Sequence, residues 1–408
     1  MKKVKLGEIS ELAIGFVGTV TTQYEENGIP FLRTLNIKPY KIDSYDLKRI
    51  TRSFHESQKK SILHHGDIIM VHTGIPGFCC VIPPEYDDSN CIDAIVIRPD
   101  RTKVNPYYLE AYMNTVGYKH IERQQVGCVQ KHFNLNDAVD FELFLPDLEE
   151  QNRVAELICS VNQKLFFNDN ILIELEAMAK MLYDYWFTQF DFPNEEGKPY
   201  RSSGGEMVWN DQLKRAIPKR WDVGNLYAIA NPINGLACQK HRPKENEKAL
   251  PVVKIKEMHE GITEETELVS VNIPDKHKIF DGDILFSWSA TLEVMYWFGG
   301  DAGLNQHIFK VVPVNEFSKE YVYHQFSAYV INFVKMAEAR KTTMGHITTD
   351  HLAQSKIVLP PHEIVEAFSE IVAPIHQKIG QCQKENRELI KLRNWLLPML
   401  MNGQATVK

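Results

Sequence analysis

The 408-residue sequence lacks long apolar runs, and no stretch approaches the roughly 20 consecutive apolar residues that a membrane-spanning helix needs. Its start, MKKVKLGEIS, has two adjacent lysines but no apolar core like that of a secretory signal peptide. It also lacks a C-x-x-C pair among its seven cysteines, which argues against zinc ribbons and thioredoxin-like sites. We therefore expect a cytoplasmic protein with reduced, packed thiols and no membrane partner.

Excess positive charge is missing too, since 46 Lys and Arg face 53 Asp and Glu for a net charge of −7. A uniformly basic nucleic-acid coat is excluded, so any DNA contact has to come from local basic surfaces. Hydrophobic residues make up 44% and charged residues 24%, which is typical of a globular protein with a sizeable core. The length favours two or three domains.

Recognisable catalytic motifs are absent as well. There is no G-x-x-x-x-G-K-[ST] phosphate loop, no G-x-G-x-x-G turn after a strand and no H-E-x-x-H helix. Pro83-Pro84-Glu85-Tyr86 lacks the leading Asn or Asp of an amino-methyltransferase tetrapeptide. Neither Pro99-Asp100 nor Pro274-Asp275 is followed by the second half of a nuclease pattern. We expect no catalytic residue and no metal site in this chain, which favours a binding protein.

What the sequence does contain is an internal duplication. Gly66-Asp67-Ile68 recurs as Gly282-Asp283-Ile284, an offset of 216, and Leu145-Pro146 recurs as Leu359-Pro360, an offset of 214. Pro30-Phe31-Leu32-Arg33 has a weaker echo in Pro251-Val252-Val253-Lys254, an offset of 221. Three matches in the same order with nearly constant offset indicate two related domains, because a period this long is far too great for a solenoid.

A long helix is expected after each domain. Apolar residues at alternating spacings of four and three form a heptad seam: Val154, Ile158, Val161, Leu165, Asn168, Leu172, Leu175, Ala179, Leu182 and Trp186. The same register, shifted by 214, gives Phe368, Val372, Ile375, Ile379, Cys382, Asn386, Leu389, Arg393, Leu396 and Leu400. A single such helix would be an ordinary amphipathic one, whereas two in matching register favour an intramolecular coiled coil. Asn168 and Asn386 either fix its register or lie on a solvated rim, and Pro374 should kink the second helix.

The fold class that follows is α+β: two similar α/β domains joined by two long helices. Nearly all-apolar strands are expected after the two Gly-Asp turns, at 67–72 and 283–288, each opening into a polar loop. The expected divisions are a first domain at 1–145, a first helix at 146–187, a linker at 188–222, a second domain at 223–359, and a second helix with its tail at 360–408.

Polar and basic side chains in the loops are the candidates for DNA contacts, since these residue types read phosphates and base edges. In the first domain they are Arg33, Asn36, Lys38, His72, Thr73, Lys131, His132 and Asn134. In the second they are Lys254, Lys256, Ser287, Asn305, Gln306, His307, Arg340, Lys341, Thr342, Thr343 and His346. Basic clusters such as 239–244 fit phosphate contact and a solvated charged face equally well.

The linker carries a family resemblance. Residues 186–226, WFTQFDFPNEEGKPYRSSGGEMVWNDQLKRAIPKRWDVGNL, resemble the F-x-F…G-K-P-Y-x-S-S-G-G-x-M…I-P-x-x-W signature of the specificity subunits of Type I restriction-modification systems. Leu145-Pro146 with Glu150-Gln151 resembles the family's L-P-P-L-x-E-Q boundary, from which Glu363-Ile364 departs. The ending Leu392 to Pro398 resembles its L-R-x-x-L-L-P close.

The resemblance implies a non-catalytic reader of double-stranded DNA. In the family, two target-recognition domains each read half of a bipartite site, and the two helices pair antiparallel as a spacer on which two modification subunits dock. S-adenosylmethionine then binds to the modification subunits, ATP and Mg²⁺ to two restriction subunits where these join, and no cofactor binds to this chain. Two alternatives are an enzyme in its own right, such as a fused nuclease, and a coiled-coil scaffold with no nucleic-acid role.

Overall fold

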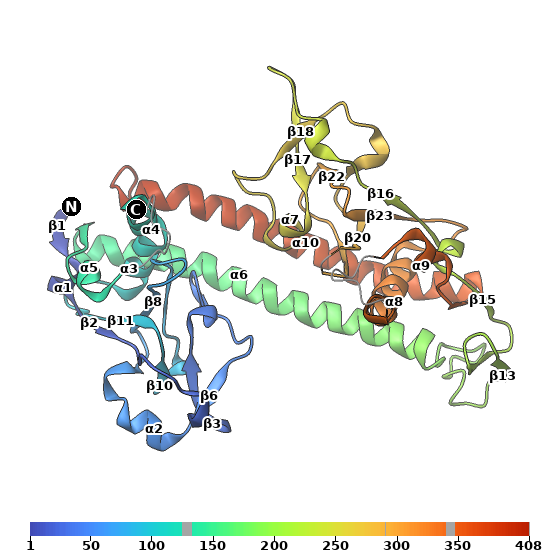
Figure 1. Cartoon of the computed structure of the whole chain (residues 1–408), viewed down its shortest axis with the longest axis horizontal. Coiled ribbons are helices and arrows are strands. Elements are labelled where there is room, and N and C mark those ends of the chain that lie inside the picture. The colour runs from blue at the N-terminus through green and yellow to red at the C-terminus, as the bar shows by residue number, and fades with distance from the viewer. Residues whose placement is uncertain (125–132, 290, 340–346, 408) are drawn as a thin grey trace. The chain divides into compact units, whose positions relative to one another are not determined.

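The computed structural model describes residues 1–124, 133–289, 291–339 and 347–407. They divide into two compact units, one of Met1–Phe166 with Glu388–Lys408 and one of Phe167–Arg387. Each unit combines a sheet-rich domain with parts of two long helices, α6 (Leu148–Tyr183) and α10 (His362–Met401) (Figure 1). The expected α+β architecture is confirmed. None of the helices in the described ranges is long and apolar enough to cross a lipid bilayer.

The first unit is built on two four-stranded sheets. One has the order β6 (Lys48–Ile50), β3 (Tyr24–Leu32), β10 (Ser89–Cys91), β7 (Ile62–Leu63), and the other β2 (Ser10–Ile14), β11 (Ala94–Pro99), β8 (Ile68–Val71), β9 (Cys79–Val81). Two-stranded pairs join β1 (Lys2–Lys5) to β12 (Glu142–Leu145) and β4 (Ile37–Lys38) to β5 (Lys41–Ile42). The helices are α1 (Leu6–Ile9), α2 (Arg52–Ser57), α3 (Pro106–Tyr112), α4 (Tyr118–Gln124) and α5 (Leu135–Val139).

The second unit repeats this plan. Its sheets have the orders β18 (Leu268–Ser270), β17 (Ala249–Val253), β22 (Ala302–Leu304), β19 (Lys278–Ile279) and β16 (Ala230–Asn234), β23 (Ile308–Pro313), β20 (Ile284–Ser287), β21 (Glu293–Tyr296). The pair β15 (Asp222–Gly224) and β24 (Ile357–Leu359) matches β1 and β12. The helices are α7 (Ile255–Glu260), α8 (Lys319–Ala339) and α9 (Thr349–Ala353). In both units one pair of the described strands is parallel, β3 with β10 and β17 with β22, and it lies at the same place among antiparallel pairs, so the duplication is confirmed.

The Gly-Asp turns show why short motifs recur in both units. Gly66 and Gly282 both have positive φ, at 90° and 88°, which glycine adopts without strain. The carboxylate of Asp67 accepts a hydrogen bond from the backbone N–H of His64, and that of Asp283 accepts one from Phe280. Each turn therefore feeds a fully buried strand, β8 or β20, into the middle of its sheet.

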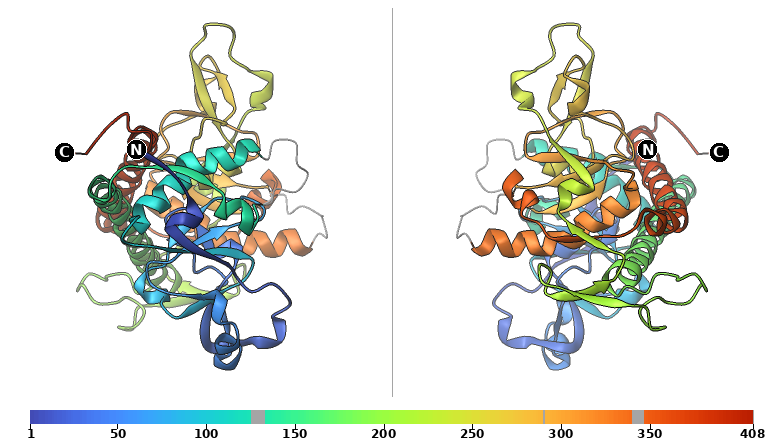
Figure 2. Two further views of the ribbon diagram at one scale, coloured as in Figure 1. Left: turned by 90° about the vertical axis from the view of Figure 1, so that its left-hand side faces the viewer. Right: turned by 90° about the vertical axis from the view of Figure 1, so that its right-hand side faces the viewer.

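The two long helices lie side by side and run antiparallel (Figures 1 and 2). Arg393 donates to Asn162 in the first unit and Asn168 donates to Asn386 in the second, so the number of the partner on α10 falls as the number on α6 rises. All the expected seam residues are buried or half-buried: Val154, Ile158, Val161, Leu165, Asn168, Leu172, Leu175 and Leu182 on α6, and Phe368, Val372, Ile375, Ile379, Asn386, Leu389 and Leu396 on α10. The heptad positions therefore lie on the less exposed faces of both helices.

Helix α10 continues unbroken through Pro374 and Gly380. The Pro374 side chain is exposed. A Cβ at Gly380 would lie 2.4 Å from Cε1 of Phe298, so glycine is needed here for the ring to pack on the helix. The glycine that weakens the helix locally is thus explained by a tertiary contact.

The linker aromatic residues form part of the second unit's core. Trp186, Phe187, Phe190, Phe192 and Trp221 are all buried there. The Phe190 and Trp221 rings meet edge to face with centroids 5.2 Å apart, and Phe192 stacks on Trp221 at 5.1 Å. A hairpin of β13 (Met207–Asn210) and β14 (Arg215–Pro218) completes the segment. These rings anchor the end of α6 to the domain that follows it.

Candidate nucleic-acid interface

Three segments meet at one end of the central strands in each unit, and we call this place the strand-end surface. In the first unit it comprises residues 14–16, 72–77 and 91–94, and in the second 234–236, 287–289 and 305–307. The backbone N–H of Gly15 donates to Ala94 O, and the backbone N–H of Gly235 donates to Ile308 O. The same backbone hydrogen bond is therefore formed at corresponding places in both units. A Cβ at Gly235 would lie 2.0 Å from Asn305 O, so only glycine permits it.

Backbone hydrogen bonds link this surface to the first described residue after each undescribed segment. Phe133 N donates to His72 O at 2.9 Å, and Ile347 N donates to Trp288 O at 3.1 Å. Phe133 and Ile347 therefore lie beside equivalent strand ends in the two units. Seven of the predicted DNA contacts fall outside the described residues: Lys131, His132, Arg340, Lys341, Thr342, Thr343 and His346.

The second unit gathers polar and aromatic side chains at its strand-end surface. The Trp288 indole N–H donates to Asn234 Oδ1 at 3.3 Å, and its ring lies 5.5 Å from the His307 ring between centroids. The Gln306 amide nitrogen is 3.3 Å from Nε2 of His307. Amide and imidazole groups can read base edges, and an indole can stack on a base. The sequence predicted Gln306 and His307 here, but not Trp288 or Asn234 as contacts.

The first unit has the same backbone but a different surface. Ile92 forms an isolated parallel β-bridge with Phe16, and Asn305 forms one with Leu236. The loops that carry Ile92 and Asn305 therefore occupy equivalent places in the two units. The side chains there are Ile92, Asp93 and Ala94 in place of Asn305, Gln306 and His307. The two units therefore offer unlike chemical patterns from one framework, which suits recognition of two unlike sequences.

Three of the predicted contacts have buried side chains that form hydrogen bonds within this chain. Asn36 is 0% exposed: its amide donates to Asp43 O and Tyr45 O, and its Oδ1 accepts from Arg33 N. Ser287 Oγ donates to Ser289 O, and Asn305 Oδ1 accepts from His307 N. These side chains shape loops rather than face a ligand. The polar-residue pattern could not separate them from surface residues, because loop-holding and ligand-binding use the same side-chain types.

The remaining first-unit candidates lie at the surface. Lys38 is exposed on β4, Thr73 is half-buried beside His72, and Asn134 is exposed. Asn134 is also the N-cap of α5, where its Oδ1 accepts from Asp137 N at 3.0 Å. Thr348 occupies the same capping position before α9. Asn134 thus has a structural role that would exist without DNA.

Several basic candidates are already paired with carboxylates. Arg33 lies 2.9 Å from Asp46 Oδ2, and Lys254 lies 2.6 Å from Glu267 Oε2. Lys256 is 3.8 Å from both Glu260 and Glu265. By contrast, the exposed Lys240 and Arg242 form no ion pair within the described part of the chain. Unpaired cations at the surface attract phosphates most strongly, so this cluster is the clearest candidate for backbone contact.

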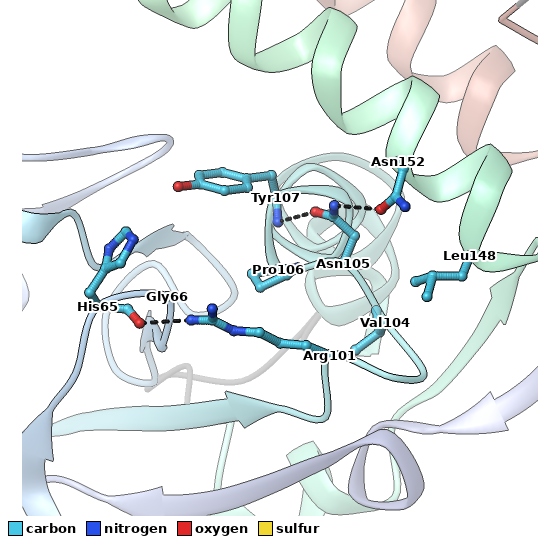
Figure 3. A pocket seen from close by; sticks show the side chains of 9 residues that line it. All are labelled: His65, Gly66, Arg101, Val104, Asn105, Pro106, Tyr107, Leu148 and Asn152. Carbon is cyan, nitrogen blue, oxygen red and sulfur yellow. Dashed lines mark hydrogen bonds between the residues drawn. The ribbon is translucent and has the colours of Figure 1, made fainter.

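A cleft of about 280 Å³ lies where α3 and the start of α6 meet in the first unit (Figure 3). Arg101 donates to His65 O at 2.8 Å, and the Asn105 amide donates to Asn152 Oδ1 at 2.9 Å. Asn105 Oδ1 accepts from Tyr107 N as the N-cap of α3. The hydrogen bond from Asn105 to Asn152 fastens α6 to the domain. In the described ranges, no group of three or more His, Cys, Asp or Glu side chains could hold a metal ion.

The comparisons with known proteins agree with the geometry. Residues 218–389 match the family model for the Type I restriction modification DNA specificity domain. The Type I restriction enzyme MjaIX specificity subunit of Methanocaldococcus jannaschii is 24% identical, over 100% of this chain and 94% of that protein. The HindI specificity subunit of Haemophilus influenzae is 22% identical, over 99% of both chains. The crystal structure of the S subunit from M. genitalium has the same fold, with a TM-score of 0.58 at 14% identity, covering 98% of this chain and 95% of that one.

Proposed function

This chain belongs to the specificity subunits of Type I restriction-modification systems, and we propose that it reads a bipartite DNA site with one half-site for each unit. One observation carries the proposal: two domains of identical strand order present unlike side chains at equivalent strand-end surfaces. A common frame fixes how each domain meets the duplex, while Trp288, Gln306 and His307 in one unit and His72 and Asp93 in the other make different sequences readable.

The helix pair is the proposed platform for the other subunits. Its outer faces expose large apolar side chains in both units, including Ile171, Met178 and Met181 on α6 and Leu392 and Trp395 on α10. Apolar residues repeated along a helix exterior are typical of protein interfaces. Two modification subunits would dock there, and two restriction subunits would join in a cleaving complex, all within the cytoplasm.

The chain itself supplies recognition and no chemistry. The methyl donor S-adenosylmethionine is proposed to bind to the modification subunits, and ATP with Mg²⁺ to the restriction subunits. The role left to this chain is to bind phosphates through cations such as Lys240 and Arg242 and to select bases through the strand-end surface.

The test is modification by the reconstituted complex. The chain is expressed with the modification subunit of the same system, and methylated positions in the host DNA are sequenced. We expect one two-part motif with a fixed gap, methylated only when both proteins are present. Methyl transfer by this chain alone, or methylation without any defined motif, would contradict the proposal.

A further inference from the structure

Each unit has a basic pocket where the end of one long helix meets a helical segment of the domain. In the first unit a pocket of about 320 Å³ lies between residues 115–123 and the end of α10. In the second unit a pocket of about 170 Å³ lies between α8 and the segment that ends α6. Each pocket is formed by residues of one unit alone.

The two pockets occupy equivalent places in the duplicated frame. Asn105 and Ser318 cap α3 and α8 in the same way, because the side-chain oxygen of each accepts from the backbone N–H three residues later. This sets an offset of 213 between α3 and α8. At that offset three wall residues of one pocket correspond to three of the other: Thr115, Val116 and Lys119 to Ala328, Tyr329 and Asn332. The offset of 214 that relates the long helices matches a fourth pair of wall residues, Asn402 and Thr188.

Both pockets carry positive charge that no carboxylate among the described residues neutralises. Lys119 and Arg123 line the first pocket, and Arg215 and Lys356 line the second. None of these four side chains forms an ion pair within the described ranges, and no described Asp or Glu lines either pocket. Two cations held close together without a counter-charge favour binding of an anion.

Arg215 shows the missing anion most clearly. Its guanidinium lies 4.4 Å above the centre of the Phe190 ring, and its Nε is buried with no hydrogen-bond partner in the described part of the chain. Burial lowers the pKa of Arg215 from its ordinary value, because no carboxylate offsets the loss of water. The other described arginines with such an Nε use another guanidinium nitrogen on an acceptor of this chain: Arg33 on Asp46, Arg153 on Glu149, Arg387 on Asp281 and Arg393 on Asn162.

The pockets share their chemistry, whereas the two strand-end surfaces do not. The cations come from α4 in the first unit, but from β14 and the residue before β24 in the second. The common charge therefore belongs to the place and is not one copied motif. Two unlike half-sites need unlike reading surfaces, while two copies of one partner need like contacts. The pockets thus suit a partner that is present twice.

The first pocket faces away from the strand-end surface. A Cβ at Gly77 would lie 3.1 Å from Cδ1 of Ile121, and the Tyr118 ring stacks on Phe78 with centroids 4.4 Å apart. At about 100° per residue, Tyr118 and Ile121 lie on the side of α4 roughly opposite to the two cations. A duplex on the strand-end surface would lie across α4 from this pocket, which favours a protein carboxylate over a DNA phosphate.

We propose that each pocket receives an Asp or Glu side chain of a partner protein that binds in two copies. Guanidinium and ammonium groups form charge-assisted hydrogen bonds with carboxylates, and a recessed site strengthens them by limiting water. The inference rests on the proposed function in taking the modification subunit as that partner.

The first experiment measures binding of the modification subunit to the full chain without DNA. Arg215→Gln should weaken one of two binding steps about tenfold or more and leave the other unchanged. Lys119→Gln combined with Arg123→Gln should weaken the other step in the same way. If Arg215→Gln does not fold, Lys356→Gln replaces it, since this side chain is exposed, and should weaken its step about threefold.

Lys60→Gln and Lys214→Gln are the matched controls. Each removes one exposed positive charge from one of the two units, outside the pockets, and should bind within about twofold of the unaltered chain. Urea unfolding of all variants tests a purely structural role. Pocket cations that only balance the carbonyl groups at the end of a long helix would lower stability and leave binding unchanged, which overturns the inference.

The second experiment identifies the anion with a carbodiimide, which joins lysine amines to carboxyl groups in contact with them. Because the pockets are equivalent, Lys119 and Lys356 should be joined to the same acidic peptide of the modification subunit. Links to two unrelated peptides, or to none of that subunit, would overturn the inference.

The outcomes separate the two proposals. If the unaltered chain binds no modification subunit, the proposed function fails. If it binds and the pocket variants bind equally well, only this inference fails. Variants that weaken DNA binding alone would assign the pockets to phosphates of the duplex. Binding of inorganic phosphate that the modification subunit does not displace would assign them to a free ion, and either result overturns the inference.

Discussion

Asn168 and Asn386 face each other across the helix pair in the second unit, where Asn168 Nδ2 donates to Asn386 Oδ1 at 2.8 Å. Asn386 Nδ2 in turn donates to Asp169 Oδ1, and Asn168 Nδ2 also reaches Glu385 Oε2. Asn168 is 1% exposed. The alternative of a solvated rim is therefore excluded for Asn168, and sliding the helices would bury its amide without a partner.

This pair predicts an asymmetry between single and double substitutions. Asn168→Leu leaves the Asn386 amide facing an apolar side chain and should cost about 1–3 kcal/mol of unfolding free energy. Asn168→Leu combined with Asn386→Leu removes both polar groups and should recover most of that loss. Urea unfolding of the unaltered chain, of Asn168→Leu, of Asn386→Leu and of the double variant measures it. A double variant as unstable as the sum of its singles would show that the pair is not coupled.

The salt dependence of DNA binding should identify the phosphate contacts. Lys240→Ala and Arg242→Ala should each weaken binding to all sequences alike and reduce the slope of log K against log salt by about 1. Lys254→Ala is the matched control, since its ammonium group is paired with Glu267. Equal slopes for all three variants would assign the cluster at 239–244 to a solvated surface instead.

The two half-sites should respond to different residues. Trp288→Ala or Gln306→Ala should relax the half-site read by the second unit, at about 1–3 kcal/mol per affected base pair. His72→Ala, at the position equivalent to Trp288, should affect only the other half. A methylation profile over a library randomised in both halves gives the answer. A change of preference in both halves from one substitution would show that the units do not read independently.

Acid should destabilise the second unit through its buried histidine pair. Burial lowers the pKa of His324 to about 3 and that of His376 to about 4, from an ordinary value near 6.5. The folded state therefore resists protonation of the two imidazoles. The unfolding free energy that depends on their being neutral is fully present above about pH 6.5 and is lost as the pH falls towards their pKa values in the folded state.

The residues of the first unit provide the control, since Ala111 and Asn162 stand at the equivalent places. Between pH 7 and pH 4.5, the double variant His324→Ala, His376→Asn should lose roughly 2–4 kcal/mol less unfolding free energy than the unaltered chain. Urea unfolding at both pH values measures the difference, and carboxylates cancel in the comparison. Parallel losses in the two proteins would place the acid sensitivity elsewhere.

The helices and the duplication could be read from the sequence because both depend on local, repeated patterns. The heptad spacing identified the interface on α6 and α10, and the Gly-Asp motifs located β8 and β20 at the centre of their sheets. The expected helix at 319–339 is α8. In each case the signal lies in the order of neighbouring residues, because the periodicity of a helix or strand depends on the local sequence and not on distant segments.

The site was less accessible from sequence because burial decides which polar residues can meet a ligand. Asn36 and Gln306 are both loop amides, yet one holds its own loop and the other lies at the strand-end surface. Trp288 and Asn234 come together only because the strands β20 and β16 both pack against β23. Nothing in the spacing of 54 residues between them could have indicated it.

The sequence by itself thus determined the duplicated plan and the heptad seam of each long helix, since helical and strand periodicity follow from backbone geometry alone. Only the tertiary structure decided how Arg393 and Ala179 are packed: Arg393 lies over the Tyr40 ring, whereas Ala179 is fully buried in the core of the second unit. The two residues occupy equivalent seam positions, and what each contacts depends on segments far away in the sequence, such as the one that carries Tyr40. Periodicity specifies which face of a helix is buried, and packing specifies what it is buried against.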